Sequence, residues 1–304
     1  MSVLVELPAE NYSETAFANF SPEADFNLGT ARAMIWASQL AYETHRPDND
    51  TIKFVTKLWK FPKITPFNKR VDAFETSFDT CGIIAERGDA TIVAFSGTDP
   101  AVWENIVTNG KIGPTPGADT HFGFTKAFEA VWETVGTAMT TCAKPIFITG
   151  HSLGAALAVL ASKRASDSAL PHVATYTFGL PRVGGEIFAN AYNATLGATT
   201  YRLVHGNDVV AAVPMSRLGF RHVGRLLRCA SDGKFNAAGL LAVGSDDPQF
   251  TASLAQGVVA GISAALTGKF LSPKGPGPIG PLFKFLPAQI RDHLPDRYIK
   301  ALMP

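Results

Sequence analysis

The sequence predicts an α/β fold in which a central, mostly parallel β-sheet is flanked by helices. Between residues 145 and 205, short apolar segments alternate with segments of helical periodicity, which is typical of a parallel sheet. The chain has 304 residues, of which 46% are hydrophobic and 17% are charged, so it can bury a large core. We interpret residues 1–304 as one domain with an N-terminal arm at 1–26 and an irregular C-terminal insertion at 230–288.

The elements of this fold are expected in the following order. Residues 1–26 show no periodicity, and a helix with Thr30 as its N-cap follows them. The next segment is rich in proline, lysine and aromatic residues, which predicts extended chain. Strands are then expected at 73–78, 81–85, 90–95, 146–149, 172–178, 200–205 and 220–227, and helices at 101–108, 121–142, 153–165 and 184–196.

The stretch 145–165 is where local structure and chemistry coincide. Its residues 150–154, with the sequence GHSLG, lie between a predicted buried strand and a predicted buried helix. A G-x-S-x-G sequence at such a turn is typical of a nucleophile elbow, because glycines permit a very tight backbone and the serine Oγ then stands above the sheet. The start of the helix also offers backbone N–H groups to an anion. Ser152 is therefore the candidate nucleophile.

A serine nucleophile requires a base to accept its proton and an acid to orient that base. In an α/β-hydrolase these residues follow each other as Ser, Asp or Glu, His, which leaves His222 and His293 as candidate bases. A structural role is expected for His222 in its predicted strand, whereas His293 lies in a predicted loop that can direct it towards the elbow. Asp208 follows the strand expected at 200–205 and is the candidate acid. The structural alternatives are an Asx turn at Asp208 and a capping or surface position for His293.

Composition and charge bear on the possible partners. The chain has 27 basic and 26 acidic residues and a formal net charge of +1, with no run of lysine or arginine, so nothing indicates nucleic acid. No secretory leader is visible, so we expect either a protein that stays in the cell or one whose leader has been removed. The longest apolar stretch, 254–266, is shorter than the ~20 residues that cross a bilayer, and we expect no transmembrane segment.

The three cysteines, Cys81, Cys142 and Cys229, are sparse and lack metal-ligand spacing. This pattern argues against a disulfide framework and against a zinc site. We expect buried thiols, no metal and no cofactor.

Several motifs, taken together and in order, resemble the class 3, fungal-type triacylglycerol lipase family of α/β-hydrolases. They span about two-thirds of the chain, and the central one is the GHSLGAALA sequence at 150–158. The others are FSGT at 95–98, HFGF at 121–124, FGLPRVG at 178–184, NDVV at 207–210 with Pro214, HVG at 222–224, and DH at 292–293 with Tyr298.

The resemblance implies a role for each of the candidate residues. Ser152, Asp208 and His293 take the places of the nucleophile, the acid and the base. The oxyanion donors of the family correspond to the backbone N–H groups of Thr98 and Leu153, with the Thr98 hydroxyl as a further donor.

The chain also departs from the family pattern. The family commonly has arginine where this chain has Ser96, so a local ion pair is expected to be missing. Secreted members often carry disulfides, and three cysteines cannot supply a full set. The insertion at 230–288 has no recognised counterpart, which leaves the acyl pocket undefined.

Three functions are compatible with these observations. The favoured one is a lipase, a serine carboxylic-ester hydrolase that cleaves acylglycerol esters at a lipid–water interface through an acyl-enzyme. The second keeps the triad but acts as a phospholipase, or as an esterase on soluble or aryl esters. The third is a catalytically silent homologue that binds lipid or a partner, against which the complete set of Ser152, Asp208 and His293 argues.

Residues 99–118 are expected to form a lid. Within the helix predicted at 101–108, the four apolar side chains Val102, Trp103, Ile106 and Val107 share one face, and the following glycine-rich loop supplies a hinge. We expect this face to cover Ser152 in water and to turn outward during transient contact with a lipid surface. The alternative is a small helix packed permanently on the core.

The lid hypothesis predicts interfacial activation. The rate on a short-chain ester should rise sharply where the ester exceeds its solubility and aggregates form, and Trp103→Ser should reduce that rise. The measurement is initial rate against ester concentration across the solubility limit. A smooth hyperbola that Trp103→Ser leaves unchanged would instead indicate a fixed helix.

Overall fold

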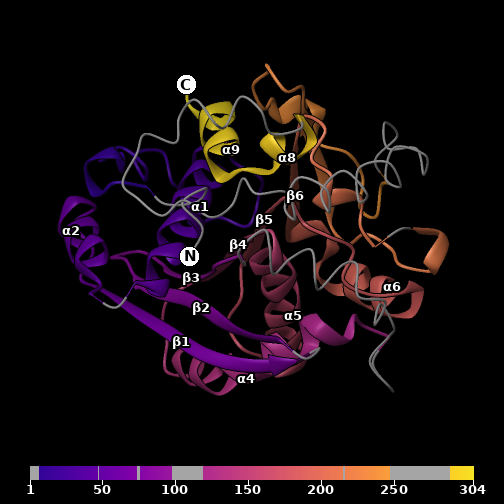
Figure 1. The fold of residues 1–304 in the computed structure, drawn as a ribbon, viewed down its shortest axis with the longest axis horizontal. Coiled ribbons are helices and arrows are strands. Elements are labelled where there is room, and N and C mark those ends of the chain that lie inside the picture. The colour runs from indigo at the N-terminus through magenta and orange to yellow at the C-terminus, as the bar shows by residue number, and fades with distance from the viewer. Residues whose placement is uncertain (1–6, 47, 74–75, 98–118, 215, 247–287) are drawn as a thin grey trace.

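The computed structural model of the chain describes residues 7–46, 48–73, 76–97, 119–214, 216–246 and 288–304. In this part of the chain, seven strands form one sheet in which their spatial order equals their order in the sequence (Figure 1). The strands are β1 (Lys63–Ala73), β2 (Thr76–Glu86), β3 (Thr91–Phe95), β4 (Ile146–His151), β5 (Ala174–Phe178), β6 (Thr200–His205) and β7 (Arg225–Cys229).

Helices of two kinds connect or flank these strands. The α-helices are α1 (Leu28–Ala41), α2 (Asp50–Leu58), α4 (Phe122–Thr140), α5 (Leu153–Asp167), α6 (Glu186–Leu196), α8 (Ala288–His293) and α9 (Pro295–Leu302). Short 3-10 helices lie at Ala9–Asn11, Tyr42–His45, Gly197–Thr199, Val210–Ala212, Ser216–Leu218 and Ala237–Gly239.

The sheet is mostly parallel. The first three strands pair in antiparallel fashion, β1 with β2 and β2 with β3. Each pair from β3–β4 to β6–β7 is parallel. The carboxyl ends of β3 to β6 therefore meet at one edge, where α/β proteins build their sites. The predicted central parallel sheet flanked by helices is confirmed.

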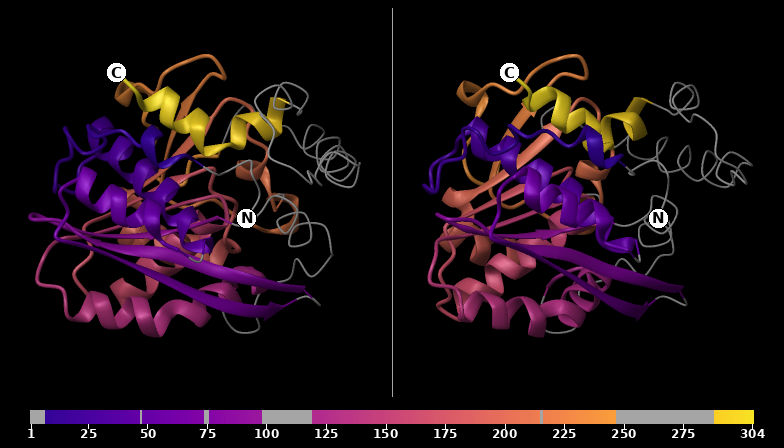
Figure 2. Two further views of the ribbon diagram at one scale, coloured as in Figure 1. Left: turned by 60° about the vertical axis from the view of Figure 1, so that its left-hand side comes forward. Right: turned by 90° about the vertical axis from the view of Figure 1, so that its left-hand side faces the viewer.

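The helices cover both faces of the sheet. α1 and α9 contact each other on one face, where α1 crosses β3 and β4, and α4, α5 and α6 lie on the other (Figures 1 and 2). Each face buries its own apolar cluster. Phe147, Phe178 and Tyr298 belong to the cluster under α1 and α9, whereas Phe95 and Leu153 belong to the one under α4 and α5.

The described part of the N-terminal arm is irregular, as expected, yet it contributes to the core. Tyr12 and Phe17 are both less than a tenth exposed. The ring of Phe17 packs edge-on against Trp59 with centroids 4.9 Å apart, and the Trp59 indole donates to the Ser13 carbonyl over 2.9 Å. The arm thus covers the face of the sheet on which α1 lies.

Three predictions in the first half of the chain were wrong in detail. The N-cap of α1 is Asn27, whose side chain accepts from the N–H of Thr30 over 3.0 Å, so Thr30 already lies inside the helix. α2 occupies part of the segment expected to be extended. The strand expected at 73–78 begins on the last residue of β1, and its residues 76–78 form one strand, β2, with those of the strand expected at 81–85. β2 pairs with β1 along its whole length.

The described start of the predicted insertion, 230–246, follows the edge of the sheet. The Leu241 N–H donates to the Leu226 carbonyl over 2.8 Å, and Val243 forms a β-bridge with Arg225. This segment therefore covers β7, the last strand of the sheet. The residues from 247 to 287 lie outside the described part of the chain.

Helix α5 approaches the sheet closely because two glycines leave room for it. A Cβ placed on Gly150, in β4, would lie 2.1 Å from the Gly154 carbonyl oxygen. A Cβ on Gly154 would lie 2.3 Å from the carbonyl oxygen of Phe95, in β3. Both contacts are with backbone atoms, so any side chain at either position would push the helix away from the strands.

This packing predicts that Gly150→Ala destabilises the fold. The added methyl group must displace the backbone of α5, at a cost of about 3 kcal/mol, the upper end of the usual penalty for overpacking. Gly88→Ala is the matched control, because Gly88 is exposed with no atom within 4 Å of its would-be Cβ, and a change below about 0.5 kcal/mol is expected. Chemical denaturation measures both, and equal stabilities of the two variants would contradict the packing argument.

Candidate active site

Ser152 occupies the sharp turn between β4 and α5. Its backbone has φ 60° and ψ −126°, a conformation that L-residues adopt only when the surrounding structure holds them in it. Part of that hold is the Ser152 N–H, which donates to the carbonyl of Phe178 in the neighbouring strand over 2.9 Å. The turn is a nucleophile elbow, and Ser152 is 3% exposed.

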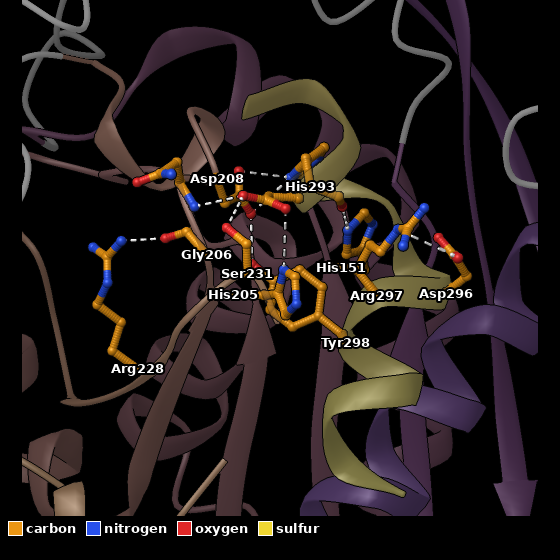
Figure 3. A network of polar contacts seen from close by, with 12 residues as sticks. His151, His205, Gly206, Asp208, Arg228, Ser231, His293, Asp296, Arg297 and Tyr298 are labelled. Carbon is orange, nitrogen blue, oxygen red and sulfur yellow. Dashed lines mark hydrogen bonds and ion pairs between the residues drawn. The ribbon is translucent and has the colours of Figure 1, made fainter. Parts of the chain in front are cut away.

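The structure brings together the three residues that the sequence singled out. The Ser152 Oγ lies 2.9 Å from Nε2 of His293. On the other side of the ring, Nδ1 lies 2.9 Å from Oδ2 and 3.0 Å from Oδ1 of Asp208 (Figure 3). His293 was predicted to lie in a loop, but it is the last residue of α8. A hydroxyl, an imidazole and a carboxylate in this order can pass a proton from the serine to the ring.

Asp208 is fully buried but remains ionised. Burial alone would raise its pKa, yet the charge of His293, with hydrogen bonds from His293 and Tyr298, holds that pKa below its ordinary value. The Tyr298 hydroxyl donates to Oδ2 over 2.5 Å, and the Val210 N–H donates to Oδ1 over 2.8 Å. A buried carboxylate with three donors can stabilise a cationic imidazole next to it.

His151 is adjacent to the nucleophile but cannot act as its base. Burial, followed by the nearby charge of His293, lowers the pKa of its imidazole to about 3, so the ring is neutral at physiological pH. Nε2 lies 2.6 Å from the His293 carbonyl oxygen and must donate to it. Nδ1 therefore accepts from the Tyr42 hydroxyl, at 2.7 Å.

His222, the other candidate base, lies apart from the triad. It precedes β7, which begins at Arg225, so the predicted strand position was wrong. The side chain is buried, and the pKa of its imidazole is lowered, mainly by burial and then by Arg202 and Arg182. Its electrostatic neighbours are thus two arginines and not the Ser152 hydroxyl.

The expected oxyanion donors fall partly within the described residues. Leu153 is the first residue of α5, where a backbone N–H has no acceptor within the helix and stays available to an anion. The described chain before the lid region ends at Gly97, whose would-be Cβ lies 3.0 Å from the Ser152 Cβ. Thr98 and the four residues of the predicted lid face, Val102, Trp103, Ile106 and Val107, lie outside the described residues.

Two tyrosines in contact with the site were not predicted as part of it. Tyr298 lies on α9 and donates to Asp208, and Tyr42 follows α1 and bonds His151. The pKa of the Tyr298 phenol is raised well above its ordinary value, by burial and then by Asp208, so it remains a donor. Tyr298 was noted in the motif with residues 292–293 but was given no role, and no such signal marks Tyr42. The partner of each tyrosine is distant in the sequence.

No group of three or more potential metal ligands was found among the residues that the structure describes. Within the same residues, none of the helices combines the length and the apolarity needed to span a membrane. All three cysteines are free, and burial raises the pKa of Cys81 and of Cys229 to about 12.

Comparison with known proteins gives concordant results. Residues 88–218 match the family model described as lipase (class 3). The chain is 37% identical to secreted mono- and diacylglycerol lipase 1 of Fusarium solani, over 39% of this chain and 38% of that protein. It is 31% identical to a lipase of Rhizopus niveus, over 53% of this chain and 45% of that protein. The chain thus matches less than half the length of each of these two curated relatives.

A solved structure, that of mono- and diacylglycerol lipase from Aspergillus oryzae, has a similar fold. Its TM-score is 0.61 at 19% identity, with 77% of this chain and 92% of that chain covered. The sheet, the elbow and the Ser-His-Asp geometry together define an α/β-hydrolase. Within that class, residues 88–218 match the class 3 lipase family.

The geometry predicts different losses for the two histidines. His293→Ala removes the only imidazole in contact with Ser152 among the described residues and should lower kcat by about 10⁴-fold or more with little change in Tm. His222→Ala leaves a cavity in a buried region and should lower Tm by several degrees while keeping most of the activity. Steady-state kinetics and thermal melting of both variants measure this, and the reverse pattern would exchange the two roles.

Proposed function

We propose that this chain is a serine carboxylic-ester hydrolase that cleaves acylglycerol esters through an acyl-enzyme, with Ser152 as nucleophile, His293 as base and Asp208 as acid. The observation that carries the proposal is the continuous set of contacts from the Ser152 Oγ through the His293 ring to the Asp208 carboxylate. These contacts support the role assigned to each of the three groups.

In the first half of the reaction, Nε2 of His293 accepts the proton of the Ser152 hydroxyl while Oγ attacks the ester carbonyl. The imidazolium that forms is stabilised by the ionised carboxylate of Asp208. The negative charge that develops on the carbonyl oxygen is stabilised by hydrogen bonds from backbone N–H groups, which we assign to Leu153 at the start of α5 and to Thr98. The imidazolium then protonates the leaving alcohol, and the acyl group remains on Oγ.

In the second half, a water molecule takes the place of the alcohol. His293 accepts a proton from this water as the water oxygen attacks the acyl carbon. The imidazolium then returns the proton to Oγ of Ser152 as the bond between Oγ and the acyl carbon breaks and the carboxylic acid leaves. Only the neutral imidazole can accept a proton in either half, so activity is expected to fall in acid. Because burial lowers the pKa of His151 to about 3, protonation of His151 is not expected to cause that fall.

The substrate class rests on the relatives. Two of the proteins to which this chain is similar are named as mono- and diacylglycerol lipases, from Fusarium solani and Aspergillus oryzae. Acylglycerols form a separate phase in water, so we propose that the enzyme meets its substrate at a lipid surface. The relative from Fusarium solani is also named as secreted, and we propose the same location for this protein, which fractionation of cells and medium tests.

The proposal predicts that Ser152→Ala lowers kcat by roughly 10⁴- to 10⁶-fold, because the members of a triad act as a unit. A fluorophosphonate probe should label the wild type at Ser152 with one probe per chain, as mass spectrometry of the labelled peptide shows. Ser168→Ala is the matched control, because this serine is exposed just beyond the other end of α5, and normal labelling is expected. Turnover of Ser152→Ala close to that of the wild type would refute the proposal.

The same enzyme should then be assayed against mono-, di- and triacylglycerols, phospholipids and aryl esters of matched acyl chains. Preference for acylglycerols supports a lipase. Preference for phospholipids or for soluble aryl esters would retain the triad and replace the substrate class.

A further inference from the structure

Asp292 is a buried carboxylate next to the proposed base. It is 6% exposed and directly precedes His293 near the end of α8. Its Oδ2 accepts two hydrogen bonds, from the Asn207 backbone N–H over 2.8 Å and from the Ser231 hydroxyl over 2.7 Å. Neither Asp292 nor Ser231 takes part in the chemical steps described above.

The two donors come from segments that reach the site separately. Asn207 directly precedes Asp208 in the loop after β6, and Ser231 lies at the start of the segment that follows β7 (Figure 3 shows Ser231 near Asp208). Oδ2 of Asp292 therefore links the residue before the proposed base, His293, to the residue before the proposed acid, Asp208. The triad members that are held in this way lie 85 positions apart in the sequence.

The turn before Asn207 is shaped to admit this carboxylate. Gly206 has φ +52°, and a Cβ on it would lie 2.3 Å from Asp292 Oδ2 and 2.4 Å from the Ser231 Oγ. The Gly206 N–H is bonded to the Cys229 carbonyl over 3.0 Å, and its carbonyl accepts from Arg228. The loop is thus fixed on one side to β7, and its other side faces Asp292.

A further neighbour of the carboxylate is His205. Nδ1 of His205 lies 3.7 Å from Oδ1 of Asp292, beyond hydrogen-bond distance. Burial lowers the pKa of this imidazole more than Asp292 and Asp208 raise it, so the ring is neutral. The hydrogen bonds that Asp292 accepts from the Asn207 N–H and the Ser231 hydroxyl both come from uncharged donors. Their contribution to the site depends on the geometry of these contacts.

We propose that Asp292 is a positioning residue of the triad, which sets the separation of Asp208 and His293 through the Asn207 N–H, with Ser231 as its second anchor. This inference rests on the proposed function, because it concerns the same three groups. It also gives the beginning of the segment at 230–288 a role in the site.

The proposal predicts a defect in turnover for each active site, not only in stability. Asp292→Ala removes both hydrogen bonds, lets the base move relative to the acid and should lower kcat per titrated site by about 10²-fold, the loss typical of a 1 Å misplacement. KM should change little, because the proposed role of Asp292 concerns the geometry of the base and the acid. Asp292→Asn, which retains an acceptor oxygen, should recover a substantial part of this loss.

The measurement combines fluorophosphonate titration of active sites with steady-state kinetics on one soluble ester, for the full chain and each variant. A residue with a purely structural role would lower Tm and the titrated fraction, but turnover per titrated site would stay at the wild-type value. Asp296→Asn is the matched control, because Asp296 lies nearby on α9, is half exposed and pairs with Lys300 at the surface. It should retain wild-type turnover.

Wild-type turnover per titrated site in Asp292→Ala would overturn the proposal, as would an Asp292→Asn variant no better than Asp292→Ala. If Asp292→Ala does not fold, Ser231→Ala, which removes one anchor only, decides the question. A severalfold loss per titrated site supports the proposal, and an unchanged value overturns it. Failure of the wild type to label at Ser152 would instead refute the proposed function, independently of every Asp292 variant.

Discussion

The site depends on how closely helix α5 can approach the ends of β3 and β4. The absence of side chains at Gly150 and Gly154 lets the backbone of the helix lie against the backbone of the strands. That closeness forces the connecting residue, Ser152, into a backbone conformation with positive φ, and the surrounding hydrogen bonds keep it there. The same turn directs the serine Oγ outward and the N–H of the next residue towards the place where negative charge develops.

The second requirement is a carboxylate that stays charged without contact with water. Burial of Asp208 opposes ionisation, and the structure offsets this with the imidazole of His293, the phenol of Tyr298 and the N–H of Val210. These donors come from different elements, so the charged form is stable only when the loop after β6, the end of α8 and helix α9 are all in place. The charge on Asp208 therefore depends on the packing of the two C-terminal helices, α8 and α9.

The parts of this arrangement that were predictable from sequence are those with a local signal. The strand Thr200–His205 was predicted with the bounds that the structure has, and the β4 to α5 turn followed from its glycines and the apolar residues around it. The strand predicted at 220–227 was placed too early, because Gly224 has φ +74° and lies against the Thr200 carbonyl, so regular pairing begins only at Arg225. Helix α2 was missed because the segment around it is rich in proline, lysine and aromatic residues, although Ile52, Val55 and Leu58 have helical spacing.

Contacts between distant segments had no such local signal. Neither the link from Tyr298 to Asp208 nor the link from Tyr42 to His151 follows from periodicity or spacing. The order of residue types along the chain narrowed the base to two histidines, and tertiary structure was needed to bring one of them to Ser152 and the other to Arg182 and Arg202.

The bond between Tyr42 and His151 ties the catalytic edge to the beginning of the chain. Tyr42 follows α1 on one face of the sheet, while α5 rises from the elbow on the opposite face, and the His151 ring joins the tyrosine to the His293 carbonyl. The segment from β3 to the loop after β6 contains the proposed nucleophile and acid. The proposed base, His293, and Tyr298 follow this segment in the sequence, and Tyr42 precedes it. A unit that retains the proposed triad with both of its tyrosine supports must therefore extend from Tyr42, at the end of α1, to α9.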